Sequence, residues 1–308
     1  MRDQATAFAP ATVGNVGIGF DILGHTVQSV GDRVTARRTP GVGVRIRAIT
    51  GAQADLPLEP ERNTAGKAAL SLWQASGDRG GVELEIEKGI PLGSGLGGAA
   101  ASAVAAVVAV NALLEKGRSL LELLKFAMHG EQVASGSIHV DNIAPSLFGG
   151  LVLTVGVDNP RIKQIPVPAS IRCVLVHPHM FLSTREARGI LSRTVTLSDF
   201  VWQTANLSGF ISGCYSSDLE MIRESLEDVV IEPQRQALIP GFRDVRAAAM
   251  AGGALGCSIS GAGPTVFAWC EEPHAARIRE AMAAAFLAHG LPSDAWITSI
   301  EPVGARLL

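Results

Sequence analysis

The stretch that decides the fold is Pro91-Leu92-Gly93-Ser94-Gly95-Leu96-Gly97-Gly98-Ala99-Ala100-Ala101. It follows an alternating segment at residues 82–87, which predicts a strand, and it opens an Ala-rich run at residues 99–114, which predicts a helix. Four glycines fall within six positions, and glycine lets the main chain approach phosphate oxygens with the positive φ values that a nest of amides needs. This context predicts an anion site at a helix N-terminus, with a plain tight connection as the alternative.

Two other phosphate-binding motifs can be tested on the same residues. Gly93, Gly95 and Gly98 satisfy the dinucleotide-binding pattern G-x-G-x-x-G. That pattern requires a second strand with an acidic end about twenty residues later, whereas here Glu115 is followed by a turn and another predicted helix. The string G-x-x-x-x-G-K-[ST] of a Walker A loop does not occur in the sequence. Phosphate binding must therefore come from another family of loops.

Length, composition and charge restrict the class of protein. The 308 residues allow one large domain or two moderate ones, and 47% hydrophobic against 18% charged residues excludes wholesale disorder. The formal net charge is −3 and no long basic block occurs, so nucleic acid is not expected as a partner. The segment between Lys88 and Glu115 carries no charge, but its Gly, Ser and Ala content favours a turn and a buried helix over a membrane span.

The cysteines and the N-terminal sequence indicate a compartment. Cys173, Cys214, Cys257 and Cys270 show no C-x-x-C spacing, so neither a zinc site nor a disulfide framework is predicted. The N-terminal sequence MRDQATAFAP lacks the continuous apolar core of a signal peptide. We expect a cytoplasmic protein with reduced thiols.

Hydrophobic periodicity predicts an α+β fold in two parts. Period two predicts strands near residues 6–8, 33–38, 42–46 and 82–87, and helical spacing marks residues 63–75, 99–114 and 119–134. After Gly149-Gly150 the pattern restarts, with strands at 151–155 and 171–177, helices from 184 to about 228, and strands near 257, 267 and 297. We place the domain boundary between residues 155 and 156.

Three separated strings carry a resemblance to one kinase family. The glycine-rich string, read as P-x-G-S-G-L-G-x-x-A-A, resembles the second motif of the GHMP kinases. Residues 9–21, with APATVGNVG and GFD, resemble the first motif, and SGAGPT at residues 260–265 resembles the third. The resemblance implies a two-lobed α+β kinase with a unit like domain 2 of ribosomal protein S5 at residues 1–155. It implies a ferredoxin-like unit at residues 156–308.

The same resemblance implies ATP as the nucleotide and Mg²⁺ as its metal. Glu131, in GEQVASG at residues 130–136, is the implied metal carboxylate. Adenine would lie near Asn63, and the third motif would close the cleft opposite the glycine-rich loop. The implied nucleotide-binding residues are Asn63, Pro91, Leu92, Gly93, Ser94, Gly95, Leu96, Gly97, Gly98, Ala99, Ala100, Ala101, Gly261 and Gly263.

Further strings are similar to family members that phosphorylate the side-chain hydroxyl of L-homoserine in threonine biosynthesis. They are HVDNIAP at residues 139–145, LFGG at 147–150, STREAR at 183–188, and an arginine before IPGF at 239–242. This small molecule presents an ammonium, a carboxylate and a hydroxyl, so its pocket needs an anionic acceptor, a guanidinium fork and a group near the oxygen. A homodimer is a further expectation from the family.

The resemblance assigns a role to each polar residue of these strings. Asp21 and Asp141, with Asn15, would hold the amino end and the hydroxyl, and Arg188 and Arg235 would clamp the carboxylate. Asp141 and Asn142 form the implied catalytic pair, and no residue is firmly assigned as a general base because the transition state of phosphoryl transfer is loose. The implied substrate-binding residues are Asn15, Asp21, His139, Asp141, Thr184, Arg188 and Arg235.

The glycine-rich loop departs from the family at Ala99, which stands where a serine hydroxyl would normally ligate Mg²⁺. Alanine offers no oxygen to a cation, so we expect a weaker metal site and lower activity. Water, Ser94 or Ser102 could supply the missing ligand. Two alternatives stay open: another GHMP small-molecule kinase, and a nucleotide-binding relative with impaired catalysis.

Overall fold

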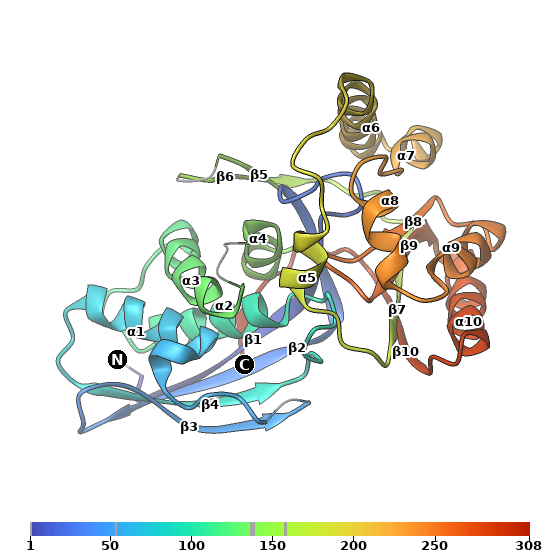
Figure 1. The fold of residues 1–308 in the computed structure, drawn as a ribbon. Coiled ribbons are helices and arrows are strands. Elements are labelled where there is room, and N and C mark those ends of the chain that lie inside the picture. The colour runs from blue at the N-terminus through green and yellow to red at the C-terminus, as the bar shows by residue number, and fades with distance from the viewer. Residues whose placement is uncertain (1, 53, 136–138, 157–158) are drawn as a thin grey trace.

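Two β-sheets with helices packed on them form the computed structural model, which describes residues 2–52, 54–135, 139–156 and 159–308. Figure 1 shows two lobes, with α5 (Thr184–Gly189) between them. Gly136, the last residue of the string at 130–136, lies outside the described residues. The mixed architecture confirms the predicted α+β class.

The N-terminal lobe is built on a seven-stranded sheet of order β11-β1-β2-β4-β3, with β5 attached to β2 and β6 to β5. β3 and β4 are parallel, and the other described pairs are antiparallel. The strands are β1 (Gln4–Gly14), β2 (Leu23–Thr39), β3 (Gly43–Gly51), β4 (Gly81–Lys88), β5 (Leu151–Val155), β6 (Arg161–Ile165) and β11 (Arg306–Leu307).

The predicted alternation of β4 gives this sheet one dry and one wet face. Val82, Leu84 and Ile86 are buried against the helices. The intervening glutamates at 83, 85 and 87 pair with arginines of β3 and β2 on the other face. Such exposed ion pairs contribute about 0–1 kcal/mol each, so burial of the dry face is what holds the strand in register.

Helices cover the dry face of this sheet (Figure 1): η1 (Pro60–Arg62), α1 (Thr64–Ser76), α2 (Gly98–Asn111), α3 (Leu120–Ser135) and α4 (Val140–Phe148). α2 lies in the middle of the layer and contacts α1, α3 and β1. Its Ala and Val side chains are buried around almost the whole helix, as expected of a helix that is apolar on every side. Within the described residues, no helix is long and apolar enough to cross a membrane.

The C-terminal lobe is built on a four-stranded antiparallel sheet of order β10-β7-β9-β8. Its strands are β7 (Ile171–Pro178), β8 (Gly256–Ile259), β9 (Val266–Glu271) and β10 (Ser293–Thr298). With α9 (Phe242–Ala251) and α10 (Glu272–Ala288), the chain order is β-α-β-β-α-β, which is the ferredoxin-like arrangement that the resemblance implied.

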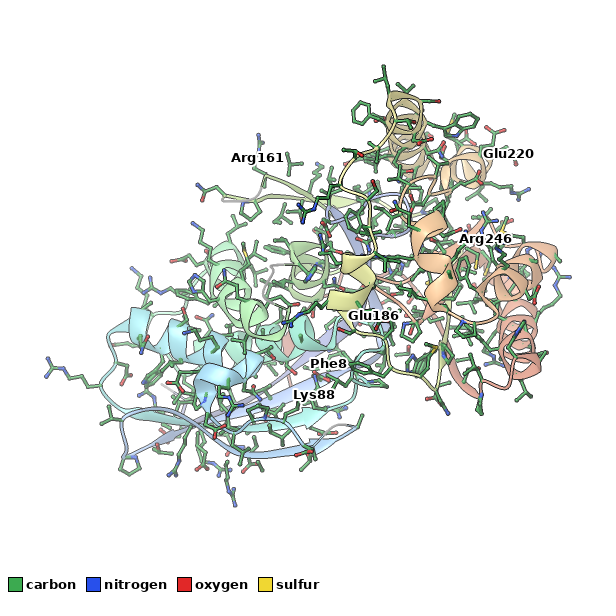
Figure 2. All side chains as sticks on the ribbon, viewed as in Figure 1. Phe8, Lys88, Arg161, Glu186, Glu220 and Arg246 are labelled. Atoms are coloured by element: carbon green, nitrogen blue, oxygen red, sulfur yellow. The ribbon has the colours of Figure 1, made fainter. Side chains whose placement is uncertain are left out.

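A helical insertion separates β7 from α9. It contains α5, α6 (Leu197–Ser216), α7 (Leu219–Ser225), α8 (Glu232–Arg235) and η2 (Gln236–Leu238). In Figure 1, α6 and α7 lie at the top of the view, and Phe210 of α6 packs on Trp269 of β9, whereas α5 and α8 face the junction of the lobes. In Figure 2 the label of Glu186 marks α5 at this junction. The insertion therefore brings two arginine-bearing helices, α5 and α8, toward the glycine-rich loop.

Several elements differ from the sequence prediction. β1 and β2 are much longer than predicted, and α4, α9 and α10 were not predicted. β6 lies beyond residue 155 but pairs with β5, and β11 returns to pair with β1. The division into residues 1–155 and 156–308 stays a proposal, and this pairing favours a boundary between Ile165 and Ile171.

Candidate active site

A cavity of about 520 Å³ lies where the two lobes meet, a volume typical of sites for small ligands. Segments far apart in the sequence line it: the turn after β1, the glycine-rich loop, α3, α4, α5, α8 and the loop between β8 and β9. It brings together most predicted site residues, namely Asn15, Asp21, Asn63, Pro91, Leu92, Gly93, Ser94, Gly95, Gly97, Gly98, Ala99, Glu131, His139, Asp141, Asn142, Thr184, Arg188, Arg235 and Gly261.

Four of the residues predicted to contact the nucleotide do not line this cavity. Leu96, Ala100 and Ala101 are buried in the core. Ala100 and Ala101 belong to the first turn of α2, which packs against β1 and the neighbouring helices. Gly263 lies beneath the loop, where its carbonyl oxygen would be 2.7 Å from a Cβ at Gly95. These residues support the loop on the side that faces away from the cavity.

The glycine-rich loop turns its carbonyl groups toward the protein. Gly93 O accepts from Leu182 N (3.2 Å), Ser94 O from Thr265 Oγ1 (2.6 Å), and Gly95 O from Ser260 Oγ (2.8 Å). The carbonyls of residues 96, 97 and 98 accept from Thr12 N, Ala101 N and Lys88 Nζ. In contrast, the N–H groups of residues 95–98 have no hydrogen-bond partner within the described part of the chain. Four unpaired donors at the start of a helix are a site for an anion.

Two glycines of this loop have backbone conformations that other residues would strain. Gly95 and Gly97 have φ values of +78° and +66°. A Cβ at Gly95 would lie 2.5 Å from Ser260 O, and one at Gly97 would lie 2.2 Å from Thr12 Oγ1. The close approach of the loop to the third motif therefore depends on glycine.

A buried ion pair lies under the start of α2. Lys88 Nζ pairs with Asp32 and donates to Ser102 Oγ (2.7 Å) and Gly98 O (2.9 Å), and Figure 2 labels Lys88 in this lobe. Asp32 Oδ1 accepts from the N–H groups of residues 89 and 90. Ser102 also donates to Asp32, so its hydroxyl is engaged by this network. Sequence reasoning assigned no role to Lys88 or Asp32, because neither belongs to a motif.

The turn after β1 is strained and braced against the third motif. Asn15, Val16 and Gly17 have consecutive φ values of +66°, +47° and +68°, an uncommon conformation for a β-branched residue such as valine. Asn15 Nδ2 donates to Gly261 O (2.9 Å), and Asn15 Oδ1 accepts from Asp21 N (2.9 Å). The Asn15 side chain therefore joins two motifs and orients Asp21 toward the cavity.

Two guanidinium groups converge on this side of the cavity. Arg188 forms a forked ion pair with Asp21, at 2.6 and 3.1 Å. Arg235 is buried and donates to the carbonyl oxygens of Ala187 and Gly261, both at 3.0 Å. Their Cζ atoms lie 5.1 and 5.2 Å from the centre of the Phe20 ring. Burial and the charge of Arg188 lower the pKa of Arg235 to about 10, so this corner is suited to an added anion.

Carboxyl groups with unpaired oxygens face the same cavity. Asp141 Oδ2 accepts from Asn15 N (3.2 Å), but Asp141 Oδ1 and Glu131 Oε2 are buried without a hydrogen-bond partner among the described residues. Burial, reinforced by the charge of Asp141, raises the pKa of Glu131 to about 8. Burial and then the charge of Asp21 raise the pKa of Asp141 to about 7. Unpaired carboxylate oxygens of this kind fit a hard cation or an ammonium group.

His139 lies beside these acids at the start of α4. Ligand atoms of His139, Asp21 and Asp141 all lie within 4.8 Å of one another. Burial, followed by the nearby charge of Arg188, lowers the pKa of His139. A neutral imidazole next to two carboxyl groups can accept or donate a hydrogen bond without adding charge.

Asn63, another residue of the cavity lining, caps a helix. Its Oδ1 accepts from the N–H groups of Ala65 and Gly66, capping α1, and its Nδ2 donates to Pro57 O. The cavity lining also includes the apolar residues Leu56, Pro57, Ile86 and Ile90, which we call the apolar slot. The side chain is therefore already engaged, and it is the slot that has the character of a nucleobase site.

Models of known protein families match two segments of the sequence. The model for the GHMP kinases N terminal domain matches residues 63–150, and that for GHMP kinases C terminal matches residues 210–288. A homoserine kinase of Xylella fastidiosa (strain M12) is 50% identical over 306 residues, which cover 99% of this chain and 94% of that protein. The chain belongs to the GHMP kinase family. It is therefore a kinase, and membership implies the use of ATP.

Other members of the GHMP kinase family agree in sequence and in structure. A homoserine kinase of Chlorobium phaeobacteroides (strain BS1) is 43% identical over 316 residues, covering 98% of this chain and 99% of that protein. The crystal structure of homoserine kinase from Cytophaga hutchinsonii ATCC 33406 has a TM-score of 0.97 at 43% identity, covering 100% of this chain and 98% of that one. The similarity therefore extends over both lobes.

Proposed function

We propose that this GHMP kinase transfers the γ-phosphoryl group of ATP to the side-chain hydroxyl of L-homoserine, a step of threonine biosynthesis. The observation that carries the proposal is the pair of guanidinium groups over Phe20, placed beside buried acids and across the cavity from unpaired loop amides. Such a corner suits a small zwitterion with a carboxylate and an ammonium. The names of relatives at 43–50% identity support the same substrate.

The polar groups of the corner divide among the three parts of homoserine. Arg188 and Arg235 would take the α-carboxylate through a guanidinium fork. Asp141 Oδ1 and Asp21 would take the ammonium, and His139 and Thr184, which line the same corner, would complete its polar wall. The hydroxyl then extends toward Asn142 and the glycine-rich loop.

The opposite half of the cavity would hold ATP. The N–H groups of residues 95–98, at the N-terminus of α2, would bind phosphate oxygens, and the ion-paired Lys88 holds the carbonyl oxygen of Gly98 beneath them. The apolar slot near Asn63 would receive adenine. These donors are fixed before the nucleotide arrives, which favours stabilisation of charge during transfer.

The residues present also fit Mg²⁺. The unpaired Oε2 of Glu131 would hold the ion, and when bound the ion supplies positive charge that neutralises the phosphate oxygens. Ala99 contributes no oxygen, and Ser102 is engaged by Asp32 and Lys88. Ser94 lines the cavity, so Ser94 or water is the candidate replacement ligand.

A substrate panel tests the proposal. The purified chain is incubated with ATP, Mg²⁺ and, in turn, L-homoserine, mevalonate, shikimate and galactose, and phosphorylated products are measured by ³¹P NMR. We expect phosphate on the hydroxyl of L-homoserine. Phosphorylation of another alcohol with L-homoserine inert would support the alternative of a different GHMP kinase. No transfer even at high Mg²⁺ would support a catalytically impaired relative.

The expected homodimer is also a proposal, and we place its interface on α6. Asp199 is the sole charged residue in the α6 sequence, and Leu197, Phe200, Val201 and Trp202 are exposed, Leu197 by 78%. An apolar helix face can pair with its own copy across a two-fold axis. Light scattering should report a dimer for the wild type and a monomer for Trp202→Glu. A wild-type monomer would contradict the proposed interface.

The cytoplasmic location stays a prediction. The four cysteines are free and buried.

A further inference from the structure

Thr12 lies where three parts of the site meet. It belongs to β1, two residues before the end of the strand, and it is fully buried. Its N–H donates to Leu96 O of the glycine-rich loop at 3.1 Å, and its Oγ1 donates to Asn142 Oδ1 on α4 at 2.9 Å. One residue of the first motif thus binds both the nucleotide loop and the amide that faces the substrate.

The carboxamide of Asn142 is held between two backbone walls. A Cβ at Gly97 would lie 2.9 Å from Asn142 Oδ1, and a Cβ at Gly14 would lie 2.7 Å from Asn142 Nδ2. Glycine at both positions makes just enough room for the amide. Within the described residues, the bond from Thr12 is the one hydrogen bond that the Asn142 side chain makes.

This bond decides which end of the amide can act in the cavity. Because Oδ1 accepts the Thr12 hydroxyl proton, the Nδ2 group remains as the hydrogen-bond donor of a side chain that lines the cavity. A donor favours the negatively charged oxygens of a transferring phosphoryl group, whereas an exposed Oδ1 would repel them. If the Asn142 amide were rotated by half a turn about its last side-chain torsion, Oδ1 would face the cavity instead of Nδ2.

We propose that Thr12 is a positioning residue, which fixes Asn142 with its NH₂ group toward the substrate hydroxyl and the phosphoryl oxygens. The inference rests on the proposed function, since it concerns the same transfer. It adds a residue that touches neither substrate. Its effect should fall on the rate of transfer rather than on binding, because the orientation of Asn142 matters most while charge develops on the phosphoryl oxygens.

Two substitutions separate positioning from support of the fold. Thr12→Val keeps the shape and the strand preference of the residue but removes the hydroxyl, and Thr12→Ser keeps the hydroxyl. We expect kcat of Thr12→Val to fall about 10- to 100-fold, the range for loss of one preorganised donor or its support. KM for both substrates should stay within about threefold, and Thr12→Ser should retain most of kcat.

The contrary results are equally clear. If Thr12→Val kept wild-type kcat, or if Thr12→Ser lost as much as Thr12→Val at an unchanged Tm, the hydroxyl would not position Asn142. If KM rose as much as kcat fell, the residue would act in binding. Tm is measured for each variant so that a general loss of folding is recognised.

A double-mutant cycle ties the effect to Asn142. In an Asn142→Ala background, Thr12→Val should change kcat by less than about twofold, because the amide it positions is gone. A full additional loss there would overturn the proposal. Should the wild type phosphorylate another alcohol instead of L-homoserine, the proposed function fails; the same cycle run with that alcohol then tests Thr12 separately.

Discussion

The two halves of the cavity are lined by different kinds of chemical group. The half proposed for ATP, which we call the nucleotide half, consists of main-chain amides and small residues, with Gly95 and Gly97 in left-handed conformations and the carbonyls of the loop fixed by the protein. The half proposed for L-homoserine, which we call the substrate half, consists of charged side chains on separate elements, including Asp21, Arg188 and Arg235. The first half depends on backbone shape, and the second depends on charge balance, so the two should fail in different ways when altered.

The largest expected effect is on the substrate half, from Arg235→Met. Loss of a buried guanidinium costs roughly 2–5 kcal/mol, which corresponds to about 30- to 5,000-fold in kcat/KM for L-homoserine. The Kd of ATP, measured by calorimetry, should change less than about threefold. Arg172→Met, which removes a surface ion pair with Glu272, is the matched control and should be near wild type. Equal losses for both substrates would break the division into halves.

The nucleotide half should be broken by Gly95→Ala. The added methyl group would meet the carbonyl oxygens of Ser260 and Gly263 at 2.5 and 2.7 Å, on a backbone with positive φ. We expect the Kd of ATP to rise about 5- to 160-fold and Tm to fall, since strain of this kind costs about 1–3 kcal/mol. Gly98→Ala is the control, because its methyl group would meet the Ile90 side chain at 3.2 Å. Similar behaviour of both variants would contradict the loop geometry.

The raised pKa of Glu131 predicts that, without metal, the difference in stability between Glu131→Gln and the wild type depends on pH. Burial raises the pKa of Glu131 to about 8 in the folded chain, against an ordinary value of 4.5 in the unfolded chain. Between these values the folded state binds more protons, so this group destabilises the fold progressively as pH rises. The Tm of Glu131→Gln should match the wild type near pH 4.5 and exceed it by about 2–4 °C near pH 8.5 in EDTA. A difference that does not vary with pH would refute this assignment.

The smallest expected effect is at the border between the halves, from Ala99→Ser. A hydroxyl at this position adds one oxygen for Mg²⁺ beside Glu131, so half-saturation should need about three- to tenfold less Mg²⁺. Rates are measured across a Mg²⁺ titration at saturating ATP and L-homoserine. Ala262→Ser, on another part of the cavity lining, should leave the titration unchanged. An unaltered Mg²⁺ requirement for Ala99→Ser would show that water or Ser94 already completes the site.

The strand, turn and helix of the nucleotide half could largely be predicted from sequence because the information for them is local. A strand, four closely spaced glycines and an Ala-rich helix specify the turn within about twenty residues. The local pattern does not tell that the side chains of Leu96, Ala100 and Ala101 are buried in the core, because their direction depends on how the loop and α2 pack on the sheet. Local patterns give the turn, but not which side of it faces the cavity.

The substrate half could be predicted only through the family resemblance. Asp21 and Arg188 are 167 residues apart, and no periodicity links them. Thr12 and Asn142 are 130 residues apart, and Lys88 reaches Asp32 across 56, so these partners became visible only in the folded chain. Each is an ordinary residue in its own strand, and the contacts that give it a role are tertiary.

The most direct measurement compares L-homoserine with two truncated analogues at saturating ATP: 3-aminopropan-1-ol, which lacks the carboxylate, and 4-hydroxybutanoate, which lacks the ammonium. If charged side chains hold both ends of the substrate, each analogue should lose at least about 100-fold in kcat/KM, with the KM of ATP unchanged. Efficient phosphorylation of either analogue would contradict the account, because the charged group that this analogue lacks would then contribute nothing to binding or transfer.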